Sequence, residues 1–107
     1  MMAAGRAAEL GASVILIEKN ATLGKKLLIT GGGRCNLTNA EFNTKLFLEK
    51  FKDDKKFLFP PFSKFSAEDT IRFFNNHGMP TKIEALNRVF PLSNSSQSVH
   101  DVLIKYL

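Results

Sequence analysis

Hydrophobic and polar positions change their spacing along the chain, and each change predicts a structural element. Residues 1–10 are rich in alanine and end before Gly11, a pattern typical of a short helix that stops at a glycine. Residues 13–18 read Ser-Val-Ile-Leu-Ile-Glu, an apolar run bounded by turn formers, which predicts a buried strand. Because small side chains let a helix approach a sheet closely, this part indicates an α/β fold.

The rest of the chain predicts helices around a pair of short strands. The helices are expected from residue 43 or 44 to 51, from Ser66 to a stop at Gly78, and from residue 95 or 96 to 107, with strands inside 81–90 around a turn at 84–87. Pro60 and Pro61 remove two backbone donors within residues 56–65. No regular helix is therefore expected in that stretch.

A glycine-rich loop follows the apolar run. Gly31, Gly32 and Gly33 carry no Cβ, so this backbone can take left-handed conformations and lie flat against a ligand. Arg34 adds a planar cation directly after them. The loop thus fits a polar, anionic, planar cofactor; the alternative is that the glycines only mark a turn. It is not a phosphate loop of the nucleotide-hydrolase type, because Lys25 is followed by lysine rather than Ser or Thr.

The helix and strand before this loop form half of a known unit. A helix that ends at glycine, followed by a strand that ends in an acid, is the second half of a β-α-β dinucleotide unit, in which the acid accepts hydrogen bonds from ribose hydroxyls. Glu18 occupies that position. The first strand and its G-x-G-x-x-G turn are missing, so the chain is expected to be a fragment that is truncated at both ends.

Composition sets wider bounds. The 107 residues carry a net charge of +5, are 44% hydrophobic and 23% charged, and include one cysteine. These values describe at most one soluble globular domain, without a disulfide framework. The sequence has neither an apolar run long enough for a membrane span nor a secretory signal at its start. A cytoplasmic protein without membrane partners is expected.

Two motifs carry a resemblance to a known family. Residues 1–39, including Thr-Gly-Gly-Gly-Arg-Cys-Asn at 30–36, and the segment Arg-Val-Phe-Pro-Leu-Ser at 88–93 resemble the BaiN/RdsA-type family of FAD-dependent, NAD(P)H-linked oxidoreductases. Asn87 stands where that family usually has glycine, but asparagine tolerates a positive φ. The resemblance implies a partial Rossmann-like FAD-binding domain of three layers with a parallel sheet. Residues 1–39 would hold the β-α-β remainder and the flavin loop, and residues 40–107 a mainly helical extension.

The resemblance also assigns cofactor-binding residues. Glu18 is expected to bind the adenosine ribose of FAD, with Lys19 beside it, and the loop is expected to touch the flavin and its pyrophosphate. The candidate set is Glu18, Lys19, Lys25, Lys26, Thr30, Gly31, Gly32, Gly33, Arg34, Cys35 and Asn36. NAD(P)H would reduce the flavin, which would then reduce a small organic substrate at a C=C bond or, as in some family assignments, uracil in RNA. This span alone, lacking the glycine turn that holds the pyrophosphate, is expected to aggregate and to be colourless.

A second hypothesis comes from the basic residues. Lysines and phenylalanines alternate between residues 50 and 65, and such a mixture can grip single-stranded nucleic acid through phosphates and bases. The members are Lys50, Lys52, Lys55, Lys56, Lys64, Phe51, Phe57, Phe59, Phe62 and Phe65. A basic interaction module without redox activity is therefore the alternative function. The simpler interpretation is a solvated cationic face over a Phe-rich core.

No catalytic residue is identified among the remaining candidates. His77 and His100 lack ligand spacing to each other or to Cys35, so no metal site is predicted. Cys35 can be a reactive thiol beside Arg34 or a small residue packed beneath the loop.

Overall fold

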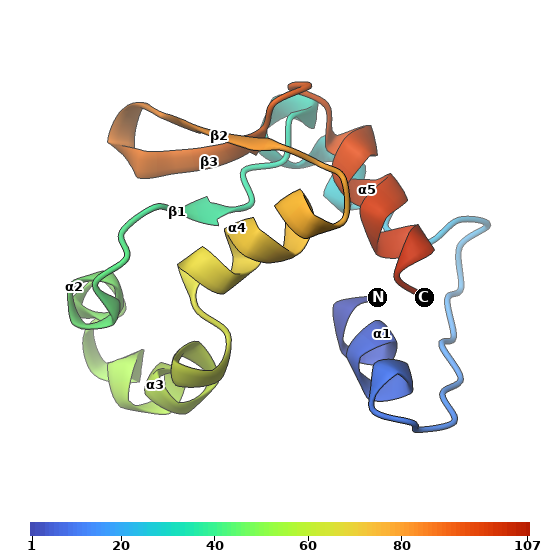
Figure 1. Cartoon of the computed structure of the whole chain (residues 1–107), viewed down its shortest axis with the longest axis horizontal. Coiled ribbons are helices and arrows are strands. Elements are labelled where there is room, and N and C mark those ends of the chain that lie inside the picture. The colour runs from blue at the N-terminus through green and yellow to red at the C-terminus, as the bar shows by residue number, and fades with distance from the viewer.

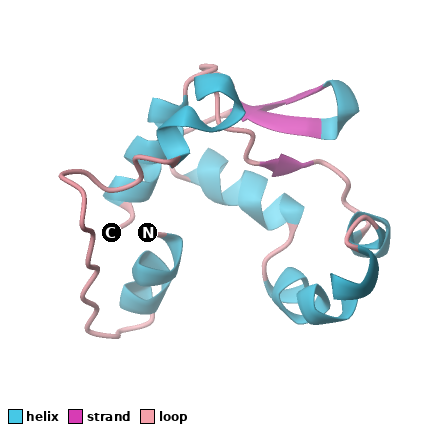
Figure 2. Cartoon of the chain, turned by 180° about the vertical axis from the view of Figure 1, so that it is seen from behind, coloured by secondary structure: helices cyan, strands magenta, loops and turns pink.

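The computed structural model describes all 107 residues, which form five α-helices around a small sheet (Figure 1). In chain order the elements are α1 (Met2–Glu9), a 3₁₀ segment (Leu27–Gly33), β1 (Thr38–Asn39), α2 (Thr44–Glu49), a 3₁₀ turn (Lys52–Asp54), α3 (Lys55–Lys64), α4 (Ala67–Asn76), β2 (Thr81–Glu84), a 3₁₀ turn (Ala85–Asn87), β3 (Arg88–Pro91) and α5 (Ser96–Lys105). Helices α2 and α3 lie on one side of the molecule, and α1 with the extended chain after it lies on the other (Figure 2). No helix is both long enough and apolar enough to cross a membrane.

The helix boundaries follow the capping residues that the sequence contains. The Ser66 hydroxyl accepts from the backbone of Asp69, whose carboxylate accepts from Ser66 in return, so a complete capping box starts α4. The Asn43 side chain caps α2 in the same sense, and Ser95 caps α5. Gly11 takes a φ of +87° just after α1. The predicted helices are therefore confirmed to within a few residues.

The sheet has the order β1-β3-β2, and both pairs are antiparallel. The predicted strands within 81–90 are confirmed as β2 and β3, which pair Glu84 with Arg88 across a tight turn. Asn87 takes a φ of +56° in that turn, as expected for the residue in the glycine position. These antiparallel strands do not form the parallel sheet that was expected for the domain. Residues 13–18, which were predicted to contribute a strand to that sheet, pair with no other segment.

That segment, residues 13–18, is extended but belongs to no sheet, so the predicted buried strand is not observed in this chain. Val14 and Leu16 are 39% and 41% exposed and line a small hollow against α1, whereas Ile15 and Ile17 are 87% and 88% exposed. The residues of this run favour a strand, and their side chains alternate between the side facing α1 and the exposed side. A strand also needs a neighbour for its N–H and C=O groups, and none lies beside it.

Helix α3 contradicts a second expectation, since it runs regularly through Pro60 and Pro61. These prolines leave the carbonyls of Lys56 and Phe57 without their helical donors. Both residues are exposed, and Phe57 is 80% so, which lets water take the place of the missing donors. An exposed helix tolerates prolines that a buried one would not.

Two apolar clusters hold the molecule together. The larger contains Cys35, Phe74, Met79, Val99, Val102 and Leu103, so the predicted first part of the chain and the helical extension share one core. The smaller cluster packs Phe47, Leu48 and Ala67 beneath α3 and gives α2 and α3 a core of their own. On α2, Leu46 is 49% exposed, whereas Leu48 is buried with Phe47.

Candidate functional site

The glycine loop is a left-handed stretch of backbone at the end of the 3₁₀ segment. Gly31, Gly32 and Gly33 have φ values of +55°, +65° and +81°, which few residues other than glycine adopt without strain. A Cβ on Gly31 would lie 2.9 Å from the backbone nitrogen of Asn36, so this glycine is also required by packing. A Cβ on Gly32 or Gly33 would meet nothing within 4 Å. The loop therefore presents an open, side-chain-free surface at Gly32 and Gly33.

Helix α5 anchors the chain that leads into this loop. The buried Ser96 hydroxyl donates to the carbonyl of Leu28 at 2.7 Å, and His100 Nε2 lies 2.9 Å from the carbonyl of Leu23. Because a carbonyl only accepts, His100 must carry a proton on Nε2. His100 thus has a structural partner and holds the turn at residues 23–24 in place.

Arg34 is fixed by the hairpin on the other side of the loop. Its Nη2 lies 2.5 Å from Glu84 Oε1 and 2.7 Å from Asn94 Oδ1, its Nε lies 3.2 Å from the same Asn94 oxygen, and its guanidinium carbon sits 4.1 Å from the centre of the Phe90 ring. The Arg34 hydrogen bond, followed by that of Lys82, lowers the pKa of Glu84 below its usual value. Only Nη1 of Arg34 has no protein acceptor, so this nitrogen remains for a ligand.

Cys35 and Asn36 turn away from the open side of the loop. Cys35 has a φ of +57° and places its thiol in the main core, where it is 6% exposed. It is therefore packed beneath the loop, which was the second of the two roles considered for it. With its amide nitrogen facing the backbone, Asn36 donates to the carbonyls of Thr38 (3.0 Å) and Val89 (3.1 Å). The Thr30 hydroxyl donates to the Leu27 carbonyl at 2.7 Å.

The lysines of the candidate set are free. Lys19, Lys25 and Lys26 are exposed, and none takes part in an ion pair. Glu84 pairs with both Arg34 and Lys82 (Nζ to Oε1 3.0 Å), so this group of three side chains keeps one net positive charge, and Lys25 and Lys26 add two unpaired positive charges in the turn before the loop. Arg34, Lys25 and Lys26 therefore all carry positive charge that can offset an anionic ligand.

Glu18 ends the extended segment at residues 13–18, and the extended chain after α1 runs along the side of the molecule beside that helix (Figure 1). The Glu18 carboxylate accepts from the backbone N–H of Asn20 at 2.8 Å and from the Asn20 side-chain amide at 2.6 Å. The backbone hydrogen bond from Asn20 is the main cause of a lowered pKa, so Glu18 is ionised and exposed at neutral pH. A dinucleotide is long, with its ribose far from its ring system, so Glu18 and the loop would contact different parts of such a ligand.

Sequence reasoning missed Glu84, Asn94 and Ser96, which hold the loop. Arg34 is 50 residues from Glu84 and 60 residues from Asn94, and no periodicity links positions so far apart. The residue type of Asn94 was a weak signal in the sequence, because asparagine tolerates a left-handed turn, and Asn94 takes a φ of +57° in the structure. His77 packs on Phe73 with ring centres 4.2 Å apart, and no group of three or more His, Cys, Asp or Glu side chains is placed to hold a metal ion.

An open glycine loop, free lysines and a helix followed by an extended segment that ends in an acid are features that a Rossmann-like nucleotide-binding domain also has. A family model described as the HI0933-like protein Rossmann domain matches residues 1–107. The chain belongs to this family, which is the BaiN/RdsA type of flavoprotein.

Several curated relatives are similar to the chain. A 3-dehydro-bile acid delta(4,6)-reductase of Clostridium scindens is 33% identical over 92 residues, which cover 86% of this chain and 22% of the relative. A ribosomal RNA dihydrouridine synthase of Escherichia coli is 30% identical over 104 residues, which cover 97% of this chain and 25% of the relative. The enzyme of the same name from Haemophilus influenzae is 26% identical over 99 residues, which cover 92% of this chain and 24% of the relative. The chain thus spans about a quarter of the length of these relatives.

Proposed function

We propose that this chain is the part of a flavin-dependent oxidoreductase that binds FAD, with the open side of the glycine loop against the cofactor. The observation that carries the proposal is the space at Gly32 and Gly33, where left-handed glycines face no protein atom. A loop needed only as a turn requires the φ values. It does not require free lysines beside it and anchors from α5 and from the hairpin behind it.

The residues present fit an anionic dinucleotide. Lys25 and Lys26 supply unpaired positive charge for the pyrophosphate. Nη1 of Arg34 supplies donors in a fixed direction, because Glu84 and Asn94 hold the rest of its guanidinium. Glu18 supplies an ionised acceptor for ribose hydroxyls. Cys35 packs in the core beneath the loop, and the side chains of Thr30 and Asn36 bond to nearby backbone carbonyls.

The reaction in the full-length protein follows from the chemistry of the cofactor. When bound, FAD would supply hydride transfer between a nicotinamide donor and a second substrate, and the protein would position the reactants and tune the flavin. We propose NAD(P)H as the donor and a C=C bond of a small organic compound as the acceptor. The names of the relatives support a C=C bond as the acceptor, since one is a 3-dehydro-bile acid delta(4,6)-reductase and another is a ribosomal RNA dihydrouridine synthase; the first name favours a small compound, and the second favours RNA.

A matched pair of glycines tests the proposal. Gly32 and Gly78 have φ values of +65° and +79°, and a Cβ on either meets nothing within 4 Å, so a valine strains both positions to a similar degree. In full-length protein, Gly32→Val should remove the yellow flavin absorbance, whereas Gly78→Val should keep it. Equal flavin content in the two variants would contradict the proposal. A colourless parent protein would instead favour the alternative of a basic module without redox activity.

A further inference from the structure

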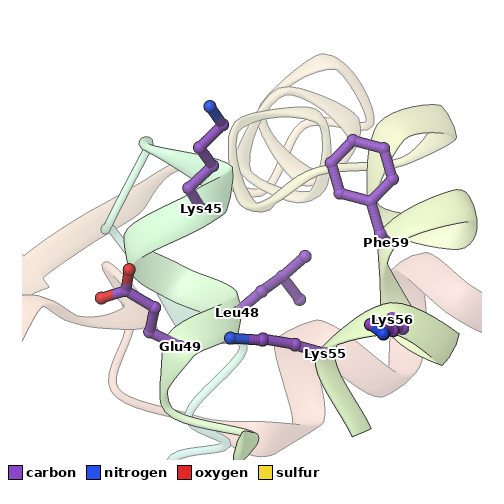
Figure 3. A pocket seen from close by; sticks show the side chains of 6 residues that line it. All are labelled: Lys45, Leu48, Glu49, Lys55, Lys56 and Phe59. Atoms are coloured by element: carbon purple, nitrogen blue, oxygen red, sulfur yellow. The ribbon is translucent and has the colours of Figure 1, made fainter. Parts of the chain in front are cut away.

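The hollow between α2 and α3 is a cavity that the flavin loop does not use. It encloses about 310 Å³ and is lined by Lys45, Leu48, Glu49, Lys55, Lys56 and Phe59 (Figure 3). Lys45 and Glu49 stand on α2, and the Phe59 ring faces the hollow from α3. The two helices and their small core form a lobe on the opposite side of the molecule from α1. This hollow is called the lobe groove below.

The lobe groove carries unneutralised positive charge. Lys45, Lys55 and Lys56 line it together with a single carboxylate, that of Glu49, and none of these lysines forms an ion pair. Three cations against one anion leave the groove with an excess of positive charge. Such a surface attracts a ligand that carries several negative charges along its length.

The aromatic rings of the lobe are divided between its core and its surface. Phe47 packs in the core, with its ring centre 4.7 Å from that of Phe62. Phe59 and Phe57 are 51% and 80% exposed, so the core of the lobe does not account for them. Phe51 is 41% exposed at the end of α2. Flat rings therefore lie at and beside a cationic groove.

We infer that the lobe groove binds single-stranded nucleic acid, with phosphates on Lys45, Lys55 and Lys56 and a base stacked on Phe59. Both halves of this ligand find a partner, since phosphates need cations and unpaired bases need exposed rings. An acidic peptide would use only the lysines and leave Phe59 uncovered. The inference concerns binding alone and goes beyond the proposed flavin reaction, so it holds or fails whether or not the protein carries FAD.

Salt dependence tests the part played by the lysines. Full-length protein would be titrated against a fluorescent oligouridylate of about 12 nucleotides, a length that one binding site can cover, and against DNA of the same length to separate RNA from DNA. Lys55→Gln with Lys56→Gln should reduce the slope of log affinity against log salt by about 1.4, because each phosphate contact on a single strand contributes about 0.7. The charge-matched control, Lys82→Gln with Lys105→Gln, lies outside the groove and should leave the slope unchanged.

Stacking is tested separately with Phe59→Leu. This substitution should weaken binding about fivefold or more without changing the salt slope, since the contribution of a stacked base is not ionic. The exposed Ile83 of β2 offers a control, and Ile83→Ala should leave affinity unchanged. Thermal unfolding of each variant would show that the fold is retained.

Several outcomes would overturn the inference. One is a parent protein that binds neither oligonucleotide at low salt. Another is an equal loss of affinity from the groove lysines and from the control lysines, which would indicate net charge alone. Competition by poly-glutamate as strong as competition by unlabelled oligonucleotide, or full affinity in Phe59→Leu, would exclude the stacking contact.

Discussion

Arg34 Nη2 lies 2.5 Å from Glu84 Oε1 and thereby ties the glycine loop to the β2–β3 hairpin. Both side chains are partly covered, with 34% and 27% of their surfaces exposed, and Asn94 and Phe90 complete the setting of the guanidinium. Because the pair spans 50 residues of chain, it holds the loop in place in a way that no local contact does. Arg34 is therefore a positioning residue first, with Nη1 left over for a ligand.

Breaking this pair should loosen the loop and weaken flavin binding. In full-length protein, Glu84→Gln is expected to lower the thermal midpoint by roughly 2–4 °C and to reduce flavin retention. Arg34→Lys should behave similarly, because an ammonium cannot bind Glu84 and Asn94 in the planar arrangement of a guanidinium. In the double variant Arg34→Ala with Glu84→Ala, the thermal midpoint should fall by less than the sum of the decreases in the single variants Arg34→Ala and Glu84→Ala. Strictly additive losses would mean that the two residues act independently.

The same pair predicts a response to acid. The pKa of Glu84 is lowered in the folded state, so its ionised form contributes stability above its ordinary pKa of 4.5. That contribution is lost as the pH falls through the lowered value. Thermal midpoints measured between neutral and acidic pH should therefore fall less steeply in Glu84→Gln than in the parent protein. Parallel curves for the two proteins would argue against the ion pair.

Local signals predicted most of the frame around the site. The capping residues of α2, α4 and α5 and the turn at Asn87 depend on neighbours in sequence, which is why pattern and residue type sufficed. The helix through Pro60 and Pro61 was not predicted, because the loss of two backbone donors was expected to prevent it. In the structure the affected residues are exposed to water, so this loss is tolerated. The strand predicted at residues 13–18 was wrong for this structure, because the segment is extended but no other segment pairs with it.

The candidate site divides in the same way. The glycines, the lysines and Glu18 could be proposed from the sequence, because residue type and short spacing along the chain mark them; their contact with FAD stays a prediction. Glu84, Asn94 and Ser96 were not visible, since their importance arises from contacts made across 50 to 68 residues. Likewise, only the structure showed that Arg34 and Lys82 share the carboxylate of Glu84.

Asp69 should govern the acid stability of α4. Hydrogen bonds from the Ser66 backbone, the Ser66 hydroxyl and Arg72 lower its pKa from 3.8 to about 2. Stability from the capping box is thus fully present above pH 3.8 and lost as the pH falls toward 2. Ser66→Ala is expected to cost about 1 kcal/mol at neutral pH, measured by denaturant unfolding. Ser63→Ala is the control, since Ser63 is exposed and caps no helix; an equal loss there would exclude the capping role.

His100 should prove structural rather than catalytic. Its Nε2–H donates to the Leu23 carbonyl whether the ring is neutral or protonated, so the contact does not depend on its charge. His100→Gln can return an N–H to that carbonyl and should keep flavin binding, whereas His100→Ala should weaken it. The pH profile of turnover should stay unchanged in His100→Gln. A displaced profile in that variant would indicate a proton-transfer role instead.

Glu18→Ala should weaken FAD binding by about tenfold or more in full-length protein, as expected for the loss of a charged hydrogen-bond partner. Glu18→Gln keeps one acceptor oxygen, so its FAD affinity should lie between that of Glu18→Ala and that of the parent protein. Equilibrium dialysis of the flavin would measure all three proteins. As a control, Glu68→Ala removes the same charge from the first turn of α4, away from the loop, and should leave FAD affinity unchanged. Unchanged affinity in Glu18→Ala would remove Glu18 from the site.

The final prediction concerns residues 13–18. In the 107-residue chain expressed alone, Ile15 and Ile17 are 87% and 88% exposed on an extended segment with free edges, so the chain should self-associate and be colourless. Ile15→Lys with Ile17→Lys should suppress that association, as measured by light scattering, whereas Leu86→Lys, at a residue 82% exposed in a hairpin turn, should not. In full-length protein the same double lysine variant should be strongly destabilising, because there the segment is expected to pair inside the parallel sheet of the Rossmann-like domain. A full-length protein that tolerates both lysines would show that the segment remains at the surface, and would remove the basis for placing Glu18 at the end of a central strand.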